Sequence, residues 1–149
     1  MKGRRMMARD FSHVEAPKHF QYKSGHTILK QSYDFICDNR IYFNETVYRD
    51  LTQHPYRLYV DVLSPIGQYG LGLDFNDVDA IYKQHIEPKL HHQLLNDTLP
   101  NMNTTAENIA MWIWDTFEQH LPKDTSMYNL ELFETERHGV SLNRTLMNK

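Results

Sequence analysis

Histidine side chains stand at three places in the sequence where they could do chemistry. His26 follows one alternating polar and aromatic stretch, and His54 comes just before another. If these stretches are neighbouring strands, both imidazoles can face one side, as a zinc site requires. The pair His91–His92 could act as a general acid or base, because an unperturbed imidazole titrates near neutral pH. Exposed histidines at element ends would explain the same residues, so both interpretations stay open.

Carboxylate and hydroxyl groups mark two further positions. Glu134 ends an alternating stretch, and a carboxylate at a strand end can accept two N–H bonds from an amidine-like ring edge if it faces a pocket. An exposed strand-end charge is the plain alternative. Thr104 and Glu107 have the spacing of a capping box at a helix start, where free N–H groups favour an anion or a polar ligand.

The helix that follows this start has the clearest pattern in the chain and is expected over residues 104–120. Pro122 cannot continue it. Its apolar residues recur every third or fourth position and form one stripe, which must pack against a sheet or another helix. The stripe consists of Ile109, Trp112, Ile113 and Phe117.

The remaining elements indicate an α+β chain with an antiparallel sheet and helices on one face. A second long helix is expected over 74–90, where Asp74 or Asn76 can cap the start. Segment 29–51 has turn signals at Asp38–Asn39 and Asn44–Glu45 and suggests a hairpin-like excursion. Alternation predicts strands at 19–28, 55–64, 126–135 and 139–142.

The domain organisation is expected to be simple. Residues 1–18 form a loose arm, 19–143 a single domain, and 144–149 a disordered tail. A four-stranded sheet leaves two open edges, and an oligomer that joins sheets into a barrel would pair them.

Bulk properties narrow the class of protein. The net charge of −3 and the pI near 6.3 argue against a nucleic-acid partner. Basic residues gather only in the N-terminal arm, at Lys2, Arg4, Arg5 and Arg9. The single cysteine, Cys37, gives no internal disulfide and fits a reducing cytoplasm. No signal peptide and no membrane span are expected, since no apolar run approaches the roughly 18 residues that a span needs.

The ordered set of motifs over residues 19–135 resembles the 6-pyruvoyl-tetrahydropterin synthase and 6-carboxytetrahydropterin synthase family. The family has an aromatic strand ending in a zinc-binding His, a His-Gly-His segment, a Gly-rich turn before Asp-Phe, an Asp-His segment, a Thr-x-Glu-Asn helix start and a pterin-anchoring Glu-Thr. The matching segments are Phe20–His26, Thr52–His54, Gly70–Phe75, Leu90–Asn96, Thr104–Asn108 and Glu134–Thr135.

The resemblance implies the tunnelling fold, whose subunits close into barrels as trimers and often stack as hexamers, with active sites between subunits. It implies 7,8-dihydroneopterin triphosphate as substrate, a zinc ion on three histidines as Lewis acid, and a Cys with an Asp-His pair for proton transfer. Carried over to this chain, it predicts zinc at His26, His54 and Thr52, and proton transfer by His92, His91 and Tyr48. It predicts pterin binding by Glu134, Thr104, Thr105 and Glu107.

The chain departs from the family pattern where the chemistry takes place. Thr52 replaces the first His of His-Gly-His, so zinc would be held less tightly. Tyr48 replaces the catalytic Cys, and a phenol is the weaker acid, with a pKa near 10 against roughly 8.5 for a thiol. His91 replaces the Asp that would orient His92. Cys37 could supply a thiol only if the excursion folds back into the site.

Three functional hypotheses follow. The first is a family lyase acting on dihydroneopterin triphosphate with a divergent zinc site. The second is a paralogue that binds a pterin or purine-like ring without turnover. The third is metal-independent chemistry resembling that of the tunnelling-fold dihydroneopterin aldolases, in which a Tyr takes part in proton transfer.

Overall fold

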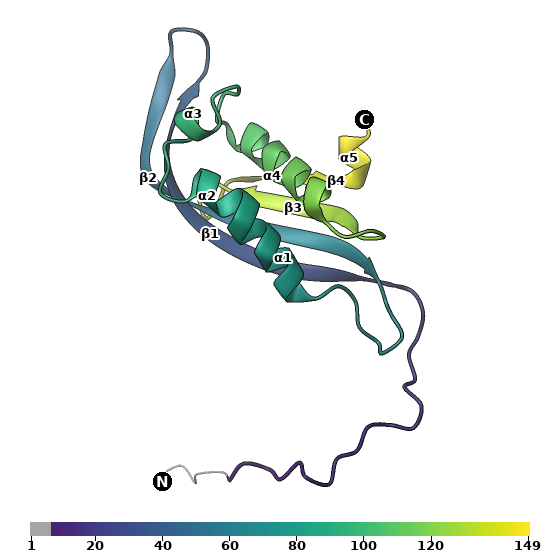
Figure 1. Ribbon diagram of the computed structural model, residues 1–149. Coiled ribbons are helices and arrows are strands. Elements are labelled where there is room, and N and C mark those ends of the chain that lie inside the picture. Colours follow the sequence, from purple (N-terminus) through teal and green to yellow (C-terminus); the bar gives the residue numbers. More distant parts are fainter. Residues whose placement is uncertain (1–6) are drawn as a thin grey trace.

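A long hairpin makes up most of the sheet. Its strands are β1 (His26–Tyr42) and β2 (Tyr48–Pro65), and β3 (Ser126–Phe133) and β4 (Gly139–Asn143) continue the sheet in the antiparallel order β1-β2-β3-β4. This is a computed structural model that describes residues 7–149 (Figure 1). Residues 1–6, with three of the four arm cations, lie outside the described residues.

The strand expected at 19–28 is wrong. Residues 19–25 have no regular structure, and β1 begins only at His26, directly after Gly25 with a φ of 154°. The excursion expected at 29–51 is instead the hairpin itself. Asn44 does lie in its turn, whereas Asp38 lies within β1, where the register shifts between Cys37 and Asn39. The inward side of β1 includes polar residues, which hid its alternation.

The second long helix was predicted correctly at its start and is irregular at its end. Asp74 caps α1 (Phe75–Ile81) by accepting the Asn76 N–H at 2.8 Å. The helix continues as a π-helical turn, η1 (Tyr82–Ile86), and α2 (Glu87–Leu90). The wide turn comes just before Pro88, which has no N–H to donate. A short helix, α3 (Leu95–Thr98), follows where a loop was expected.

The stripe helix is α4 (Ala106–His120), and its cap lies one residue later than predicted. Thr105, not Thr104, accepts the backbone N–H, from Asn108 at 3.2 Å. Ile109, Ile113 and Phe117 are fully buried, and Trp114 is buried more deeply than Trp112.

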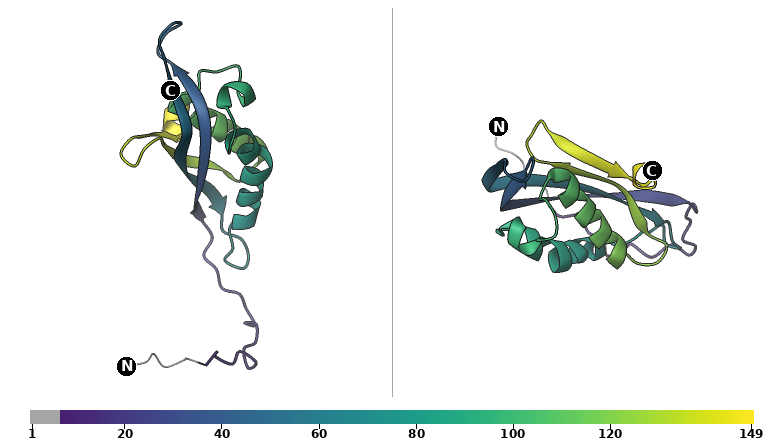
Figure 2. Two further views of the ribbon diagram at one scale, coloured as in Figure 1. Left: turned by 90° about the vertical axis from the view of Figure 1, so that its left-hand side faces the viewer. Right: turned by 90° about the horizontal axis from the view of Figure 1, so that it is seen from above.

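The two faces of the sheet differ in chemistry. The helices cover one face (Figure 2), where Leu58, Val60 and Leu130 are fully buried. The other face is polar and carries ion pairs across strands, Lys30–Asp61 at 2.9 Å and Arg57–Asp34 at 2.8 Å. A register shift between Asp61 and Val62 on β2 places Met127 of β3 in the core and leaves Tyr128 exposed.

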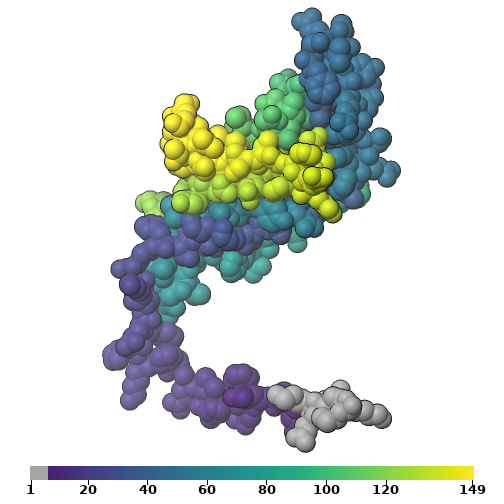
Figure 3. All heavy atoms as spheres, turned by 180° about the vertical axis from the view of Figure 1, so that it is seen from behind, coloured from purple at the N-terminus to yellow at the C-terminus, as the bar shows by residue number. Residues whose placement is uncertain are grey.

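The C-terminal end of the chain packs on the body, whereas the described part of the N-terminal arm extends away from it. The expected C-terminal tail contains a helical turn, α5 (Arg144–Met147), where Arg144 pairs with Glu118 and donates to the Met127 carbonyl at 3.0 Å. The arm over residues 7–25 leaves the body at one end of the hairpin, and the hairpin turn projects at the other (Figure 3). None of the helices in the described part of the chain is both long and apolar enough to cross a membrane.

Candidate functional site

Glu134 lies directly after β3, and its main chain is fixed from two sides. Its N–H donates to the His138 carbonyl at 2.9 Å, and its carbonyl accepts from His54 Nε2 at 2.5 Å. The Thr135 hydroxyl oxygen accepts the backbone N–H groups of Arg137 and His138, at 3.2 and 3.0 Å. The turn from β3 to β4 therefore holds Glu134 in one place.

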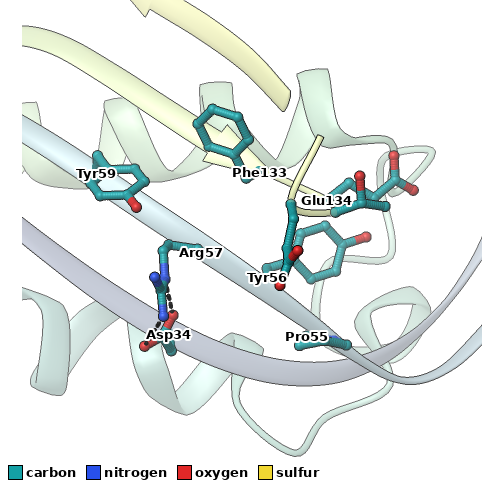
Figure 4. Close-up of a pocket in the computed structure, with 9 residues that line it drawn as sticks. Asp34, Pro55, Tyr56, Arg57, Tyr59, Phe133 and Glu134 are labelled. Carbon is teal, nitrogen blue, oxygen red and sulfur yellow. Dashed lines mark hydrogen bonds and ion pairs between the residues drawn. The ribbon is translucent and has the colours of Figure 1, made fainter. Parts of the chain in front are cut away.

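A hollow of about 500 Å³ opens beside this turn. Glu134 and Tyr56 lie on one side of it, and the Arg57–Asp34 ion pair and Tyr59 lie on the other (Figure 4). Its lining consists of Asp34, Pro55, Tyr56, Arg57, Tyr59, Phe133, Glu134, Thr135 and Glu136. The volume lies within the range of small-molecule sites, about 300–1,000 Å³.

The hollow combines one partly buried carboxylate with aromatic walls. The Tyr59 and Phe133 rings meet edge to face at 6.0 Å between centroids. Burial raises the pKa of the Tyr56 phenol far above its usual range, so this group stays protonated. A flat heterocycle could contact these rings while its N–H edge bonds the Glu134 carboxylate.

Asn39 connects the hollow to the start of α4. Its side chain is 1% exposed, and Nδ2 donates to the Thr104 carbonyl at 2.9 Å and to the Tyr56 hydroxyl at 3.3 Å. Asn39 Oδ1 is buried without a hydrogen-bond partner among the described residues. The sequence predicted Asn39 to be part of a turn, so its role as a buried hydrogen-bond donor was missed. A polar residue at an inward position of a strand would have been the only signal.

Gln53, just before His54, has an unusual backbone conformation within β2. Its φ is 44°, in the left-handed region that favours glycine, and its N–H donates to Asp38 Oδ1 at 2.5 Å. The backbone conformation that suits the Gly of a His-Gly-His segment is thus present with a glutamine.

The predicted zinc ligands are not brought together within the subunit. His26 lies opposite Pro65, whereas His54 lies opposite Cys37, eleven residues further along β1, so roughly 36 Å separates the two positions at about 3.3 Å per residue. The prediction that adjacent strands bring both imidazoles to one side is therefore wrong for one subunit. The reason is the misplaced first strand. Thr52 is exposed and lines a second hollow, of about 460 Å³, together with Asn39.

The predicted proton-transfer residues also lie apart within the subunit. Tyr48 ends the hairpin opposite Tyr42, under the Arg40 guanidinium at 3.8 Å from its ring. His91 Nδ1 accepts the Ile36 N–H at 3.2 Å, and the His92 N–H donates to the Ile36 carbonyl at 2.7 Å. Six residues, roughly 20 Å, separate Ile36 from Tyr42 along β1. Both histidines therefore cover the edge of β1.

Of the predicted pterin-binding residues, Glu134 alone lines the hollow. Thr104 is fully buried and donates from its hydroxyl to the Arg40 carbonyl at 3.1 Å. Thr105 caps α4, and Glu107 is exposed in its first turn. Arg57, which faces outward, and Tyr56, which is buried, line the hollow and were not predicted, because a strand pattern alone does not say which residues border a cavity.

The hairpin does fold Cys37 back toward His54, its cross-strand partner. The thiol is buried, and burial raises its pKa to about 12. It is therefore protonated at neutral pH, as an inert core cysteine is.

Metal-binding side chains are sparse in this region. Among the described residues, no group of three His, Cys, Asp or Glu side chains is placed to hold a metal ion. The β1 residues opposite His54 and its neighbours are Cys37, Asp38 and Asn39, of which none is a histidine. We call the part of the hairpin formed by Cys37–Asn39 of β1 and Thr52–His54 of β2 the crossing. It offers one imidazole from His54, an amide from Asn39 and a hydroxyl from Thr52. Its thiol, from Cys37, is buried, and its carboxylate, from Asp38, already accepts the Gln53 N–H.

Comparisons with known proteins agree with this architecture. A model of the family described as 6-pyruvoyl tetrahydropterin synthase matches residues 15–145. The chain is 33% identical over 99 residues to the dihydroneopterin monophosphate aldolase of Pyrococcus furiosus, covering 64% of this chain and 80% of that protein. It is 27% identical over 92 residues to the 6-pyruvoyl tetrahydrobiopterin synthase of Drosophila melanogaster, covering 59% of this chain and 55% of that protein.

Solved structures of the same kind share the fold. The Caenorhabditis elegans 6-pyruvoyl tetrahydropterin synthase superposes with a TM-score of 0.69 at 12% identity, over 83% of this chain and 99% of that one. The Plasmodium falciparum synthase gives 0.63 at 13% identity, over 80% and 98%. The tunnelling fold expected from the sequence is confirmed.

Proposed function

Because the chain belongs to the 6-pyruvoyl tetrahydropterin synthase family, we propose that it binds the ring of a reduced pterin at Glu134 and acts on the ring or its side chain without zinc. The carrying observation is the Glu134 carboxylate at the hollow, with its main chain fixed on both sides. The aminopyrimidine edge of a pterin presents two parallel N–H donors, which a carboxylate accepts as a bidentate pair.

The walls of the hollow support the same ligand. Tyr59 and Phe133 offer aromatic surface for a flat ring, and Arg57 offers a cation for a polar or phosphorylated side chain. Asp34 already pairs with Arg57, so a phosphate would have to share this guanidinium.

Zinc-assisted lyase chemistry, which the family resemblance implied, does not fit the residues present. Zinc in proteins is held by thiolates, imidazoles and carboxylates, usually three or four of them. The crossing of β1 and β2 offers a single imidazole, from His54. The Asn39 amide and the Thr52 hydroxyl are neutral and therefore weak zinc ligands. The Cys37 thiol is buried and stays protonated, and the Asp38 carboxylate already accepts the Gln53 N–H. No step of the proposal passes through a metal.

Subunits are proposed to associate through the sheet edges, as trimers or hexamers of the family do. Within the described residues, no strand pairs with the outer edge of β1 between His26 and Phe35, and β4 forms the opposite edge. Pairing β1 of one subunit with β4 of the next would remove both edges. A neighbour at β4 would also border the turn that holds Glu134.

The test is a titration of the protein with 7,8-dihydroneopterin, followed by fluorescence. Glu134→Gln removes the charge but keeps the side-chain size, and we expect it to weaken binding by roughly 30-fold, since a hydrogen bond to a charged group contributes about 1.5–3 kcal/mol. Glu131→Gln, on the strand that precedes Glu134 but outside this hollow, is the matched control and should bind like the wild type. Absence of binding by the wild type, or equal loss in both variants, would refute the proposal.

Aldolase chemistry is the second candidate, favoured by the 33% identity to the Pyrococcus furiosus enzyme. It would break the carbon–carbon bond within the pterin side chain and leave a hydroxymethyl pterin and a two-carbon aldehyde. Incubation with dihydroneopterin and its phosphates, with product separation by chromatography, decides between this cleavage, phosphate elimination and binding alone.

A further inference from the structure

His54 occupies the last position of the segment that matches His-Gly-His, yet its ring contacts Glu134. We propose that His54 is a positioning residue: it fixes the backbone of Glu134, aims the carboxylate into the hollow and does so without a metal ion. This inference rests on the proposed function for its effect on ligand binding, while its effect on the turn is independent of any ligand.

The hydrogen bond has only one possible direction. A backbone carbonyl oxygen has no hydrogen to donate, so His54 Nε2 must carry the proton. The ring is half-buried and packs edge to face on the fully buried Tyr56, with 4.9 Å between centroids. Tyr56 in turn is held by Asn39. The imidazole therefore packs against Tyr56 of β2 and donates a hydrogen bond to Glu134 at the end of β3.

Glu134 depends on this contact because few other bonds hold its peptide groups. On its other side it is tied to His138 within the same turn. The turn itself is closed by Thr135 and is otherwise exposed from Thr135 to Gly139. Removing the His54 bond would leave the turn attached to the strand hairpin alone and let the carboxylate move. Displacements of about 1 Å can cost large factors in binding or catalysis.

The arrangement also explains why a histidine is present where a zinc site is incomplete. Histidines that bind metals commonly donate their second ring nitrogen to a backbone carbonyl, which fixes the ring. His54 has such a bond to Glu134, while the neighbouring positions hold Asn39 and Thr52. The hydrogen bond to the pterin anchor is sufficient reason for this imidazole.

Two variants separate the positioning role from a metal-binding role. His54→Gln keeps an N–H donor near the place of Nε2, whereas His54→Leu removes it. An amide is a poor zinc ligand, so a metal role predicts that both variants fail equally. His85→Leu, an exposed histidine on η1, is the matched control.

The first readout is the dissociation constant for 7,8-dihydroneopterin, measured with EDTA and with added zinc. We expect His54→Leu to weaken binding about tenfold and His54→Gln to bind within about threefold of the wild type. Added zinc should leave the dissociation constants of both variants unchanged. Equal loss in both variants, or wild-type binding that fails in EDTA and returns with zinc, would overturn the inference.

The second readout needs no ligand and uses hydrogen exchange of the backbone amides in residues 133–139. His54→Leu should raise their exchange rates about tenfold, and His54→Gln should leave them near the wild type. Unchanged exchange in His54→Leu would overturn the positioning role. If the wild type binds no pterin while this exchange pattern holds, the proposed function fails and the positioning role stands.

Discussion

The turn after β3 and the crossing of β1 with β2 are joined by the His54–Glu134 hydrogen bond, and they match the predicted motifs to different degrees. The turn carries Glu134–Thr135, which match the predicted Glu-Thr motif, and the backbone of Glu134 is bonded on both sides. At the crossing, His54 follows a left-handed backbone at Gln53, and the nearby Asn39 and Thr52 offer an amide and a hydroxyl in place of further imidazoles.

The difference between the two regions suggests that binding of a ring and catalysis by a metal ion have separate structural requirements. A carboxylate anchor needs a rigid backbone and a hollow, both of which are present at Glu134. A zinc centre needs several converging donors, and replacing any of them by an amide or a hydroxyl weakens it sharply. In our proposal, the crossing supports the turn through the hydrogen bond from His54 to Glu134.

The largest expected effect comes from rebuilding the zinc ligands. Asn39→His with Thr52→His would give three imidazoles at the crossing, and we expect zinc content to rise from none to about one ion per chain. Elemental mass spectrometry of protein purified without chelators measures this. Asn39→His alone is the control and should bind zinc weakly, because two imidazoles are too few.

If the double variant is folded by circular dichroism and still binds no zinc, the claim that side chains alone distinguish the two regions is wrong. The two regions would then differ in backbone geometry as well as in side chains. The loss of the Asn39 hydrogen bonds should lower stability by about 1–3 kcal/mol, so folding must be checked.

A smaller effect concerns the thiol at the crossing and depends on pH. The pKa of Cys37 is about 12 in the folded chain against an ordinary value of 9.0. The unfolded chain therefore loses this proton first as pH rises. The free energy of unfolding should not depend on this thiol below pH 9. Between pH 9 and 12 it should fall, by at most about 1.4 kcal/mol per pH unit. Urea unfolding from pH 8 to 10.5 measures the slope, and Cys37→Ala should flatten it. An unchanged slope would show that the thiol does not contribute.

The smallest effect is at Gln53. Its left-handed backbone suits glycine, so Gln53→Gly should stabilise the chain by up to about 1 kcal/mol. Gln84→Gly, at an exposed helical position, should instead cost about 1 kcal/mol. Urea denaturation of both variants provides the values. Destabilisation by Gln53→Gly would mean that the glutamine side chain makes contacts that outweigh the strain.

Strong local patterns in the sequence predicted their elements well. The stripe of α4, the Asp74 cap and the alternation of β2 each follow from residues close in sequence. The first strand was misplaced because β1 buries Gln31 and Tyr33 toward α1, where both bond Asp79 at 2.7 and 2.6 Å. A hydrophobic pattern cannot show polar residues that are satisfied by a helix far along the chain.

The candidate site was predicted in part. Glu134 was predicted from a short motif at a strand end, and the structure places it at the hollow. The expectation that His26 lies beside His54 fails within one subunit, because the partner of a strand residue depends on register, which the turn position sets. The structural role of Asn39 was not predicted, because it depends on hydrogen bonds to Thr104 and Tyr56, which lie near Asn39 only in the folded chain.

The most direct test of the account is one titration with 7,8-dihydroneopterin on wild-type protein whose metal content has been measured before and after chelation. The account predicts no stoichiometric zinc in the purified protein and the same pterin affinity in both samples. About one zinc per chain, with affinity lost on chelation and restored by zinc, would contradict it.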